Sequence, residues 1–237
     1  MSGLSIRLTH KVMAIGLFGL VGLVAFGAIY EIGSLSQDSS RTVANRARAI
    51  ADLNNQLSIE MLEARRNEKN FQQRRNESYA KAHAELIGPI NRDFDEVERL
   101  MSAGGLGALS DKTKQAQDGF KRYATDFSAL VAAETRLGLN ETLGLSGSLR
   151  GAVHDIEAKL KELDNPRLTS WMLTMRRHEK DFMLRRDPKY VTELKKAATE
   201  FSKAMEAASV PAPVSTDIAA KLQKYQSEFV AWAETAQ

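Results

Sequence analysis

Apolar side chains recur at three- and four-residue steps along residues 43–71, with polar residues between them. The apolar positions are Val43, Ile50, Leu53, Leu57, Met61 and Phe71. Because this spacing places them on one face of a helix, the segment is predicted to be a long amphipathic α-helix. The chain has only five prolines, and residues that favour helices are abundant throughout. The sequence therefore predicts an all-α protein.

Breaks in the helical pattern divide the chain after residue 30 into six predicted helices. Glycine-rich and proline-containing segments end several of them. Asn76 and the pair Asp187-Pro188 are typical helix starts. The pair Asn165-Pro166 is interpreted as a kink inside one long helix. The predicted helices cover about 31–75, 77–103, 111–138, 146–186, 188–208 and 215–237.

The lengths of these helices predict a topology. The first and fourth are about twice as long as the others, and short connections make neighbouring helices antiparallel. We therefore expect two stacked four-helix bundles that share the two long helices. The inner bundle would contain about 31–52 and 166–237, and the outer bundle about 53–165.

Residues 12–30 form an uncharged apolar run that predicts a transmembrane helix. At 1.5 Å per residue the run spans roughly 28 Å, close to the thickness of the hydrocarbon core. Lys11 precedes it and Glu31 follows it. The positive-inside rule then places residues 1–11 in the cytoplasm and the chain after residue 30 in the periplasm, with the helix in the inner membrane. A signal peptide cleaved after Gly27 is the alternative.

Composition and motifs argue against several classes of function. The 33 basic and 30 acidic residues give a net charge of +3 that is dispersed along the chain, which disfavours binding to nucleic acid. Cysteine is absent, which excludes disulfides and thiolate metal sites. The four histidines are scattered, and the chain has neither a phosphate-binding loop nor a Glu-x-x-His pair. We expect no enzymatic activity, no cofactor and no metal.

One motif occurs twice, at a fixed offset of 111 residues. Residues 61–79 read MLEARRNEKNFQQRRNESY and residues 172–190 read MLTMRRHEKDFMLRRDPKY, with ten identical positions. The repeat extends further, because the segment at 120–127 resembles that at 222–229. A repeat of this kind predicts two related structural modules in one chain.

Each copy of the motif places a glutamate on the apolar face of its helix. Glu68 and Glu179 fall at these positions, and Arg65 and Arg176 lie three residues earlier. A buried carboxylate is costly unless it is paired, so we expect an Arg–Glu network with a structural role. Repetition in both modules favours this interpretation. The alternative makes the motif arginines, including Arg66 and Arg177, ligands of an anion.

The two RRxEKxFxxR motifs, the predicted anchor and the stretch GLSGSLRGAVHDIE at 144–157 together resemble the helical bimodular sensor domain. The resemblance covers roughly residues 31–237. It implies a periplasmic sensor of bacterial methyl-accepting chemotaxis proteins or sensor histidine kinases that binds small organic acids inside one or both bundles. In that family a second membrane span and a signalling domain normally follow, and neither is present in this chain.

A candidate ligand site follows from the expected antiparallel arrangement of the two long helices. Arg46 and Arg48 would lie level with Arg167, and Ser170 and Thr174 continue the inward face of the fourth helix. Converging guanidinium groups with nearby hydroxyls suit a dicarboxylate. The alternative is that these arginines reach solvent or pair with acidic residues.

A second, weaker candidate set lies in the expected outer bundle, where Arg66, Arg150 and His154 would be roughly level. Taken together, these observations predict the sensor region of a transmembrane chemoreceptor that binds a small carboxylate and forms a homodimer. A histidine-kinase sensor, or a membrane-anchored helical spacer that binds nothing, are the alternatives.

Overall fold

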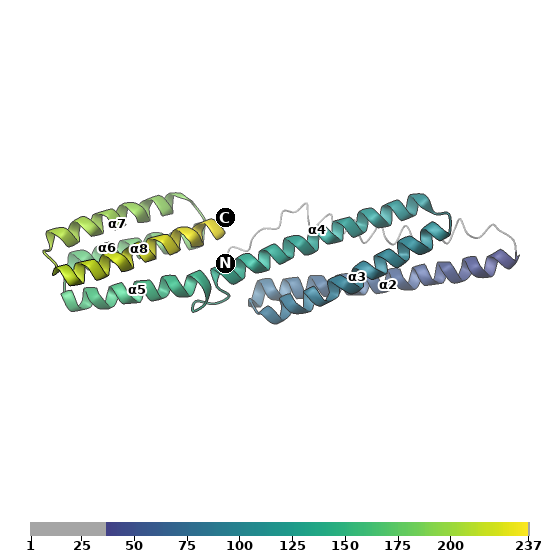
Figure 1. The fold of residues 1–237 in the computed structure, drawn as a ribbon, viewed down its shortest axis with the longest axis horizontal. Coiled ribbons are helices and arrows are strands. Elements are labelled where there is room, and N and C mark those ends of the chain that lie inside the picture. Colours follow the sequence, from purple (N-terminus) through teal and green to yellow (C-terminus); the bar gives the residue numbers. More distant parts are fainter. Residues whose placement is uncertain (1–36, 237) are drawn as a thin grey trace. The chain divides into compact units, whose positions relative to one another are not determined.

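The structure is a computed structural model that describes residues 37–236, and all the regular secondary structure in this part of the chain is helical, as predicted (Figure 1). Its helices are α2 (Gln37–Arg74), α3 (Glu77–Ala103), α4 (Gly107–Leu137), α5 (Gly144–Leu163), α6 (Pro166–Arg185), α7 (Lys189–Ala207) and α8 (Ala212–Thr235). None of these seven helices is long and apolar enough to cross a membrane. The predicted cytoplasmic segment 1–11 and the predicted transmembrane helix 12–30 lie outside the described residues.

The predicted count of six helices is wrong, because the expected fourth helix is divided into α5 and α6. Asp164 ends α5 in the left-handed conformation, with φ 46°. Asn165 then caps α6, and its side chain accepts hydrogen bonds from the N–H groups of Arg167 and Leu168 at 3.1 and 3.2 Å. Pro166 occupies the first helical position, where its missing N–H costs nothing. The chain therefore turns back here instead of kinking.

The C-terminal unit, residues 132–236, is a four-helix bundle. In it α6 packs on α7 and α5 packs on α8 (Figure 1). The centre of the core is aromatic. Its largest fully buried side chains are Tyr225, Phe182, Phe201 and Phe229.

The N-terminal unit, which ends at residue 131, contains α2, α3 and most of α4. On α2, Ile50, Leu57, Ala64 and Phe71 follow one another at seven-residue steps, and all four are buried. Seven residues are close to two turns of helix, so these side chains form one stripe along α2. The core they join also contains Ile90, Phe94 and Met101 of α3 and Phe120 of α4.

The predicted inner and outer bundles each combine helices of both units. The described residues of inner segment 31–52, which begin at residue 37, belong to the N-terminal unit, whereas residues 166–236 of the inner bundle belong to the C-terminal unit. The division into inner and outer bundles therefore stays a prediction.

The turns that end the two motif helices are built in the same way. Arg75 and Arg186 both adopt the left-handed conformation, with φ of 49° and 57°. The N–H of each donates to the phenylalanine carbonyl four residues earlier, at 2.7 and 2.8 Å. The next residue, Asn76 or Asp187, accepts a hydrogen bond from the N–H two residues later, at 2.9 and 3.0 Å. The repeat in sequence is thus a repeat in local structure.

Candidate functional site

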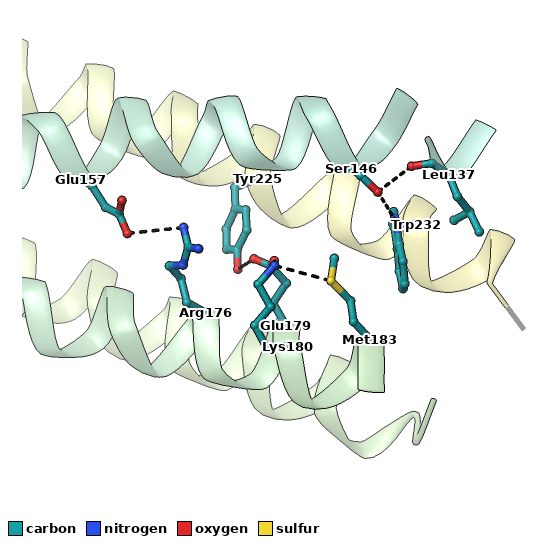
Figure 2. A network of polar contacts seen from close by, with 9 residues as sticks. All are labelled: Leu137, Ser146, Glu157, Arg176, Glu179, Lys180, Met183, Tyr225 and Trp232. Carbon is teal, nitrogen blue, oxygen red and sulfur yellow. Dashed lines mark hydrogen bonds and ion pairs between the residues drawn. The ribbon is translucent and has the colours of Figure 1, made fainter. Parts of the chain in front are cut away.

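A buried glutamate–tyrosine pair lies in each unit. Glu68 and Glu179 are both buried, with only 5% and 3% of the residue surface exposed. Oε2 of Glu68 accepts a hydrogen bond from the hydroxyl of Tyr123 at 2.9 Å, and Oε2 of Glu179 accepts one from Tyr225 at 2.8 Å (Figure 2). In both cases the glutamate comes from the motif helix and the tyrosine from the last helix of the unit.

A pair of aromatic rings accompanies each glutamate–tyrosine pair. Phe71 and Phe127 meet edge to face with centroids 5.8 Å apart, and Phe182 and Phe229 do the same at 5.7 Å. Because these contacts are the same in both units, α4 corresponds to α8, just as the repeated motif makes α2 correspond to α6. The internal repeat is therefore a three-helix unit, α2–α3–α4 and then α6–α7–α8, which the sequence indicated only at its two ends.

The motif arginines do not pair with the motif glutamates, which differs from our expectation. Arg176 instead forms an ion pair with Glu157 of α5 at 3.5 Å (Figure 2). Among residues 41–236, no acidic group lies within ion-pair distance of Arg65. A phenol inserted from the third helix satisfies the carboxylate, and this avoids burying a second full charge beside it.

The environment of the two tyrosines fixes them as hydrogen-bond donors. Burial raises the pKa of Tyr123 and of Tyr225, and the negative charge of the adjacent glutamate raises each pKa further. Each phenol therefore keeps its proton and donates a hydrogen bond to the carboxylate. The arrangement holds two helices together, and neither tyrosine is free to act as an acid or a base near neutral pH.

The N-terminal unit extends this network with a histidine that the sequence analysis did not select. Nε2 of His83 lies 3.2 Å from the hydroxyl of Tyr123, and its ring lies over Phe127 with centroids 4.2 Å apart. Burial lowers the pKa of His83 to about 4. At the offset of 111 residues its equivalent is Leu194, which is fully buried. Comparing the two copies position by position would have found it.

In the C-terminal unit, α5 and α8 are joined by a polar network at their neighbouring ends (Figure 2). The hydroxyl of Ser146 donates to the carbonyl of Leu137 at 2.7 Å and accepts from the indole N–H of Trp232 at 3.0 Å. The guanidinium of Arg186 lies over the Trp232 ring, 4.6 Å from its centroid. No local sequence pattern predicts this network, because its members come from three distant segments.

The candidate ligand residues of the expected inner bundle are divided between the two units. In the N-terminal unit Arg46 is half-buried against Gly104, at the C-terminal end of α3, and Arg48 is exposed. In the C-terminal unit Arg167 and Ser170 are exposed on α6, and the hydroxyl of Thr174 donates to the Ser170 carbonyl at 2.9 Å. Their convergence on one ligand stays a prediction.

The second candidate set is also divided. Arg66 of α2 is exposed and forms an ion pair with Glu63. Arg150 and His154 lie one turn apart on the exposed face of α5, and Arg150 is 4.0 Å from Glu141. Within residues 37–236, no group of three or more His, Asp or Glu side chains could hold a metal ion.

Comparison with known proteins adds no template for this arrangement. No family model, no curated protein and no solved structure matches the chain. The function is therefore argued from the residues and their contacts.

Proposed function

We propose that this chain is the ligand-binding sensor region of a transmembrane chemoreceptor and that it binds small organic acids. The observation that carries the proposal is the presence of two helical units, each built around the same motif and the same buried glutamate–tyrosine pair. The uncharged run at 12–30 supports a membrane anchor. Two related extracytoplasmic modules behind one anchor are an arrangement suited to sensing.

Three arginines give the proposed ligand chemistry. Among the described residues, no ion pair is formed by Arg46, Arg48 or Arg167. A guanidinium without an acidic partner is available to bind a carboxylate through two parallel hydrogen bonds. The hydroxyls of Ser170 and Thr174 would bind the polar remainder of a hydroxy acid. These groups favour a dicarboxylate over a neutral or cationic ligand.

Signal output would follow from differential binding. A ligand that binds one arrangement of the helices more tightly than another shifts the equilibrium between two signalling states. Small helix displacements are a common form of this change in membrane receptors. We propose a homodimer, in which the anchor helices of two copies lie side by side and pass the displacement across the membrane.

Two alternatives make different predictions. The same module could serve a sensor histidine kinase, and the type of output domain, a kinase core or a methylated coiled coil, would distinguish the two. A helical spacer would bind no metabolite. The unpaired arginines in the described part of the chain favour a sensor over a spacer, because a spacer has no use for them.

The proposal is tested by a thermal-shift screen of the full chain in detergent. The panel contains malate, succinate, citrate and acetate, with amino acids and polyamines for comparison. A ligand that binds only the folded state raises the melting temperature as its concentration rises. Arg167→Ala should abolish the shift, whereas Arg122→Ala, at another exposed arginine in α4, should leave it unchanged.

The screen has two outcomes that would contradict the proposal. If no carboxylate shifts the melting temperature, the chain is better described as a spacer or as a receptor for a binding protein. If a carboxylate acts equally on the parent chain and on Arg167→Ala, the ligand lies elsewhere.

A further inference from the structure

The segment that ends α3 and leads into α4 carries no charged side chain. Residues 100–110 read LMSAGGLGALS, and the last turn of α3 contains no basic residue. The last carbonyl groups of a helix carry a partial negative charge, and a nearby cation stabilises them. The neighbouring helices α2 and α4 each have an arginine in their own last turn, Arg74 and Arg136. A stabilising cation for α3 can come only from another part of the chain.

Arg46 of α2 places its guanidinium at this end of α3. A Cβ added to Gly104, the C-cap residue of α3, would lie 3.3 Å from Nη1 of Arg46 and 3.4 Å from its Cδ. The carbonyl oxygen of Met101 lies 3.3 Å from the same point. Arg46 is half-buried at this position. The guanidinium and the last carbonyl groups of α3 therefore share one small region, where their opposite charges attract.

Gly104 is the residue that lets the guanidinium come this close. Its φ of −90° lies outside the left-handed region, so the backbone conformation does not call for glycine. A side chain there would instead press on Arg46 and on the Met101 carbonyl. The N–H of Gly104 donates to the carbonyls of Leu100 and Met101 at 3.2 and 3.0 Å, which holds the turn in place beside the arginine. The missing side chain thus makes room for the cation.

The contact leaves the hydrogen-bond donors of Arg46 available. Within the described part of the chain, its guanidinium forms neither an ion pair nor a hydrogen bond. A cation at a helix end is held by a weak electrostatic attraction, whereas a carboxylate binds a guanidinium through two directional, charge-assisted hydrogen bonds. A carboxylate that reaches Arg46 therefore competes successfully with the end of α3.

We propose that Arg46 has two alternative partners, the C-terminal end of α3 and a bound carboxylate ligand. Binding of the ligand neutralises or withdraws the guanidinium, and this removes the cation from the last turn of α3. That turn then opens more often, and the contact between α2 and α3 at Gly104 loosens. The alternation rests on the proposed function, because it requires that a carboxylate binds Arg46. It supplies the difference between two helix arrangements that a ligand must exploit.

The contact with α3 is tested first, without ligand, by hydrogen exchange of the full chain in detergent. Exchange is read by mass spectrometry in peptides that cover residues 97–106. Arg46→Ala should speed exchange in the last turn of α3 about two- to fivefold, as expected for the loss of one cation at a helix end. Arg46→Lys keeps the charge and should keep most of the protection. Arg48→Ala, at an exposed arginine of the same helix, should leave exchange unchanged.

A double-mutant cycle with Gly104→Ala isolates the contact between the two residues. In the parent the new methyl group displaces the guanidinium of Arg46, whereas in Arg46→Ala there is no guanidinium to displace. Gly104→Ala should therefore speed exchange more in the parent than in Arg46→Ala. The contact of the methyl group with the Met101 carbonyl is common to both backgrounds and cancels. Equal effects in the two backgrounds would show that Arg46 and Gly104 do not interact.

The alternation is tested by adding succinate and recording the melting temperature of the same samples. Saturating succinate should speed exchange in the last turn of α3 to the level of Arg46→Ala, and it should have no effect there in Arg46→Ala itself. If Arg46→Ala exchanges like the parent without succinate, the contact with α3 is overturned.

The two measurements with succinate separate this inference from the proposed function. A rise in melting temperature without faster exchange in α3 overturns the alternation and leaves the proposed function intact. If succinate changes neither quantity, the proposed function and the alternation are both contradicted, and the contact of Arg46 with α3 is judged from the variants without ligand.

Discussion

The buried carboxylates show how one residue pair can hold two helices. An isolated carboxylate inside a protein is costly, and an arginine partner adds a second desolvation penalty. Tyr225 meets the requirement of Glu179 with a neutral donor and fills the core with its ring. Lys180 adds a charged contact at 2.7 Å from the edge of the site, where its side chain remains solvated.

His83 makes the stability of the N-terminal unit depend on pH. Its pKa is about 4 in the folded chain against an ordinary value of 6.5, so between these values the unfolded state binds more protons. The contribution of His83 to the free energy of unfolding is therefore fully present above pH 6.5. It is lost as the pH falls toward 4, and the loss is at most about 3 kcal/mol. His83 faces Tyr123 and Phe127 of α4, and Glu68 of α2 accepts a hydrogen bond from the same Tyr123 hydroxyl.

The measurement is urea unfolding followed by circular dichroism at pH 7.5 and pH 4.5. His83→Leu installs the residue of the equivalent position and should remove most of the difference for the N-terminal unit. His154→Leu, on the exposed face of α5, is the matched loss of a histidine and should leave the difference in place. An equal pH dependence in His83→Leu and the parent would show that other groups control it.

At the scale of the element, two glycines of α5 should respond in opposite ways to the same substitution. A Cβ on Gly147 would lie 2.2 Å from the Thr142 carbonyl oxygen, whereas a Cβ on Gly151 meets nothing within 4 Å. Gly147→Ala should therefore destabilise the C-terminal unit by about 1–3 kcal/mol. Gly151→Ala should stabilise it by about 0.5–1 kcal/mol, because alanine favours helix.

Tryptophan fluorescence in urea is the suitable measurement for these variants. The only two tryptophans, Trp171 and Trp232, both lie in the C-terminal unit. Their signal follows the unit that contains α5. If Gly147→Ala stabilised the unit as Gly151→Ala is expected to do, the predicted clash at Gly147 would be contradicted.

The break between α5 and α6 could have been predicted. Asn165-Pro166 has the same form as Asp187-Pro188, a side chain that accepts a backbone hydrogen bond followed by a proline where a helix starts. Pro166 is the first residue of α6, and Pro188 is the N-cap of α7. The interpretation of the first pair as a kink inside one long helix is wrong, because Asn165 caps α6 and Pro166 begins it. The same local signal that predicts a helix start at Asp187-Pro188 applies here.

The candidate site was predictable only in part. The apolar period of the motif helix was enough to place Glu68 and Glu179 on its inner face. Their tyrosine partners lie 55 and 46 residues away, so only packing reveals them. The convergence of Arg46 with Arg167 depends on how whole units are arranged, which no local pattern encodes.

At the scale of the molecule, each unit has a core of its own, so a substitution in one core should destabilise that unit and leave the stability of the other unchanged. Phe201 and Ile90 occupy equivalent positions, and both are 0% exposed. Phe201→Ala should destabilise the C-terminal unit by about 3–5 kcal/mol, and Ile90→Ala should destabilise the N-terminal unit by about 2–5 kcal/mol.

Hydrogen exchange read by mass spectrometry distinguishes the two units in one experiment. Phe201→Ala should lower the protection of α5 to α8 and spare α2 and α3. Ile90→Ala should do the reverse. Loss of protection in all helices for either variant would mean that the chain unfolds as one cooperative body.

The repeated core also bears on how the chain is made. Two sets of matching contacts in one polypeptide offer wrong partners during folding, since Glu68 and Glu179 accept the same kind of donor. The second motif copy emerges 111 residues after the first, which at about 5–20 residues per second is a delay of roughly ten seconds. Helical bundles close in about milliseconds or less. The first core can therefore be complete before its competitor exists, and the timing of synthesis selects the correct partners.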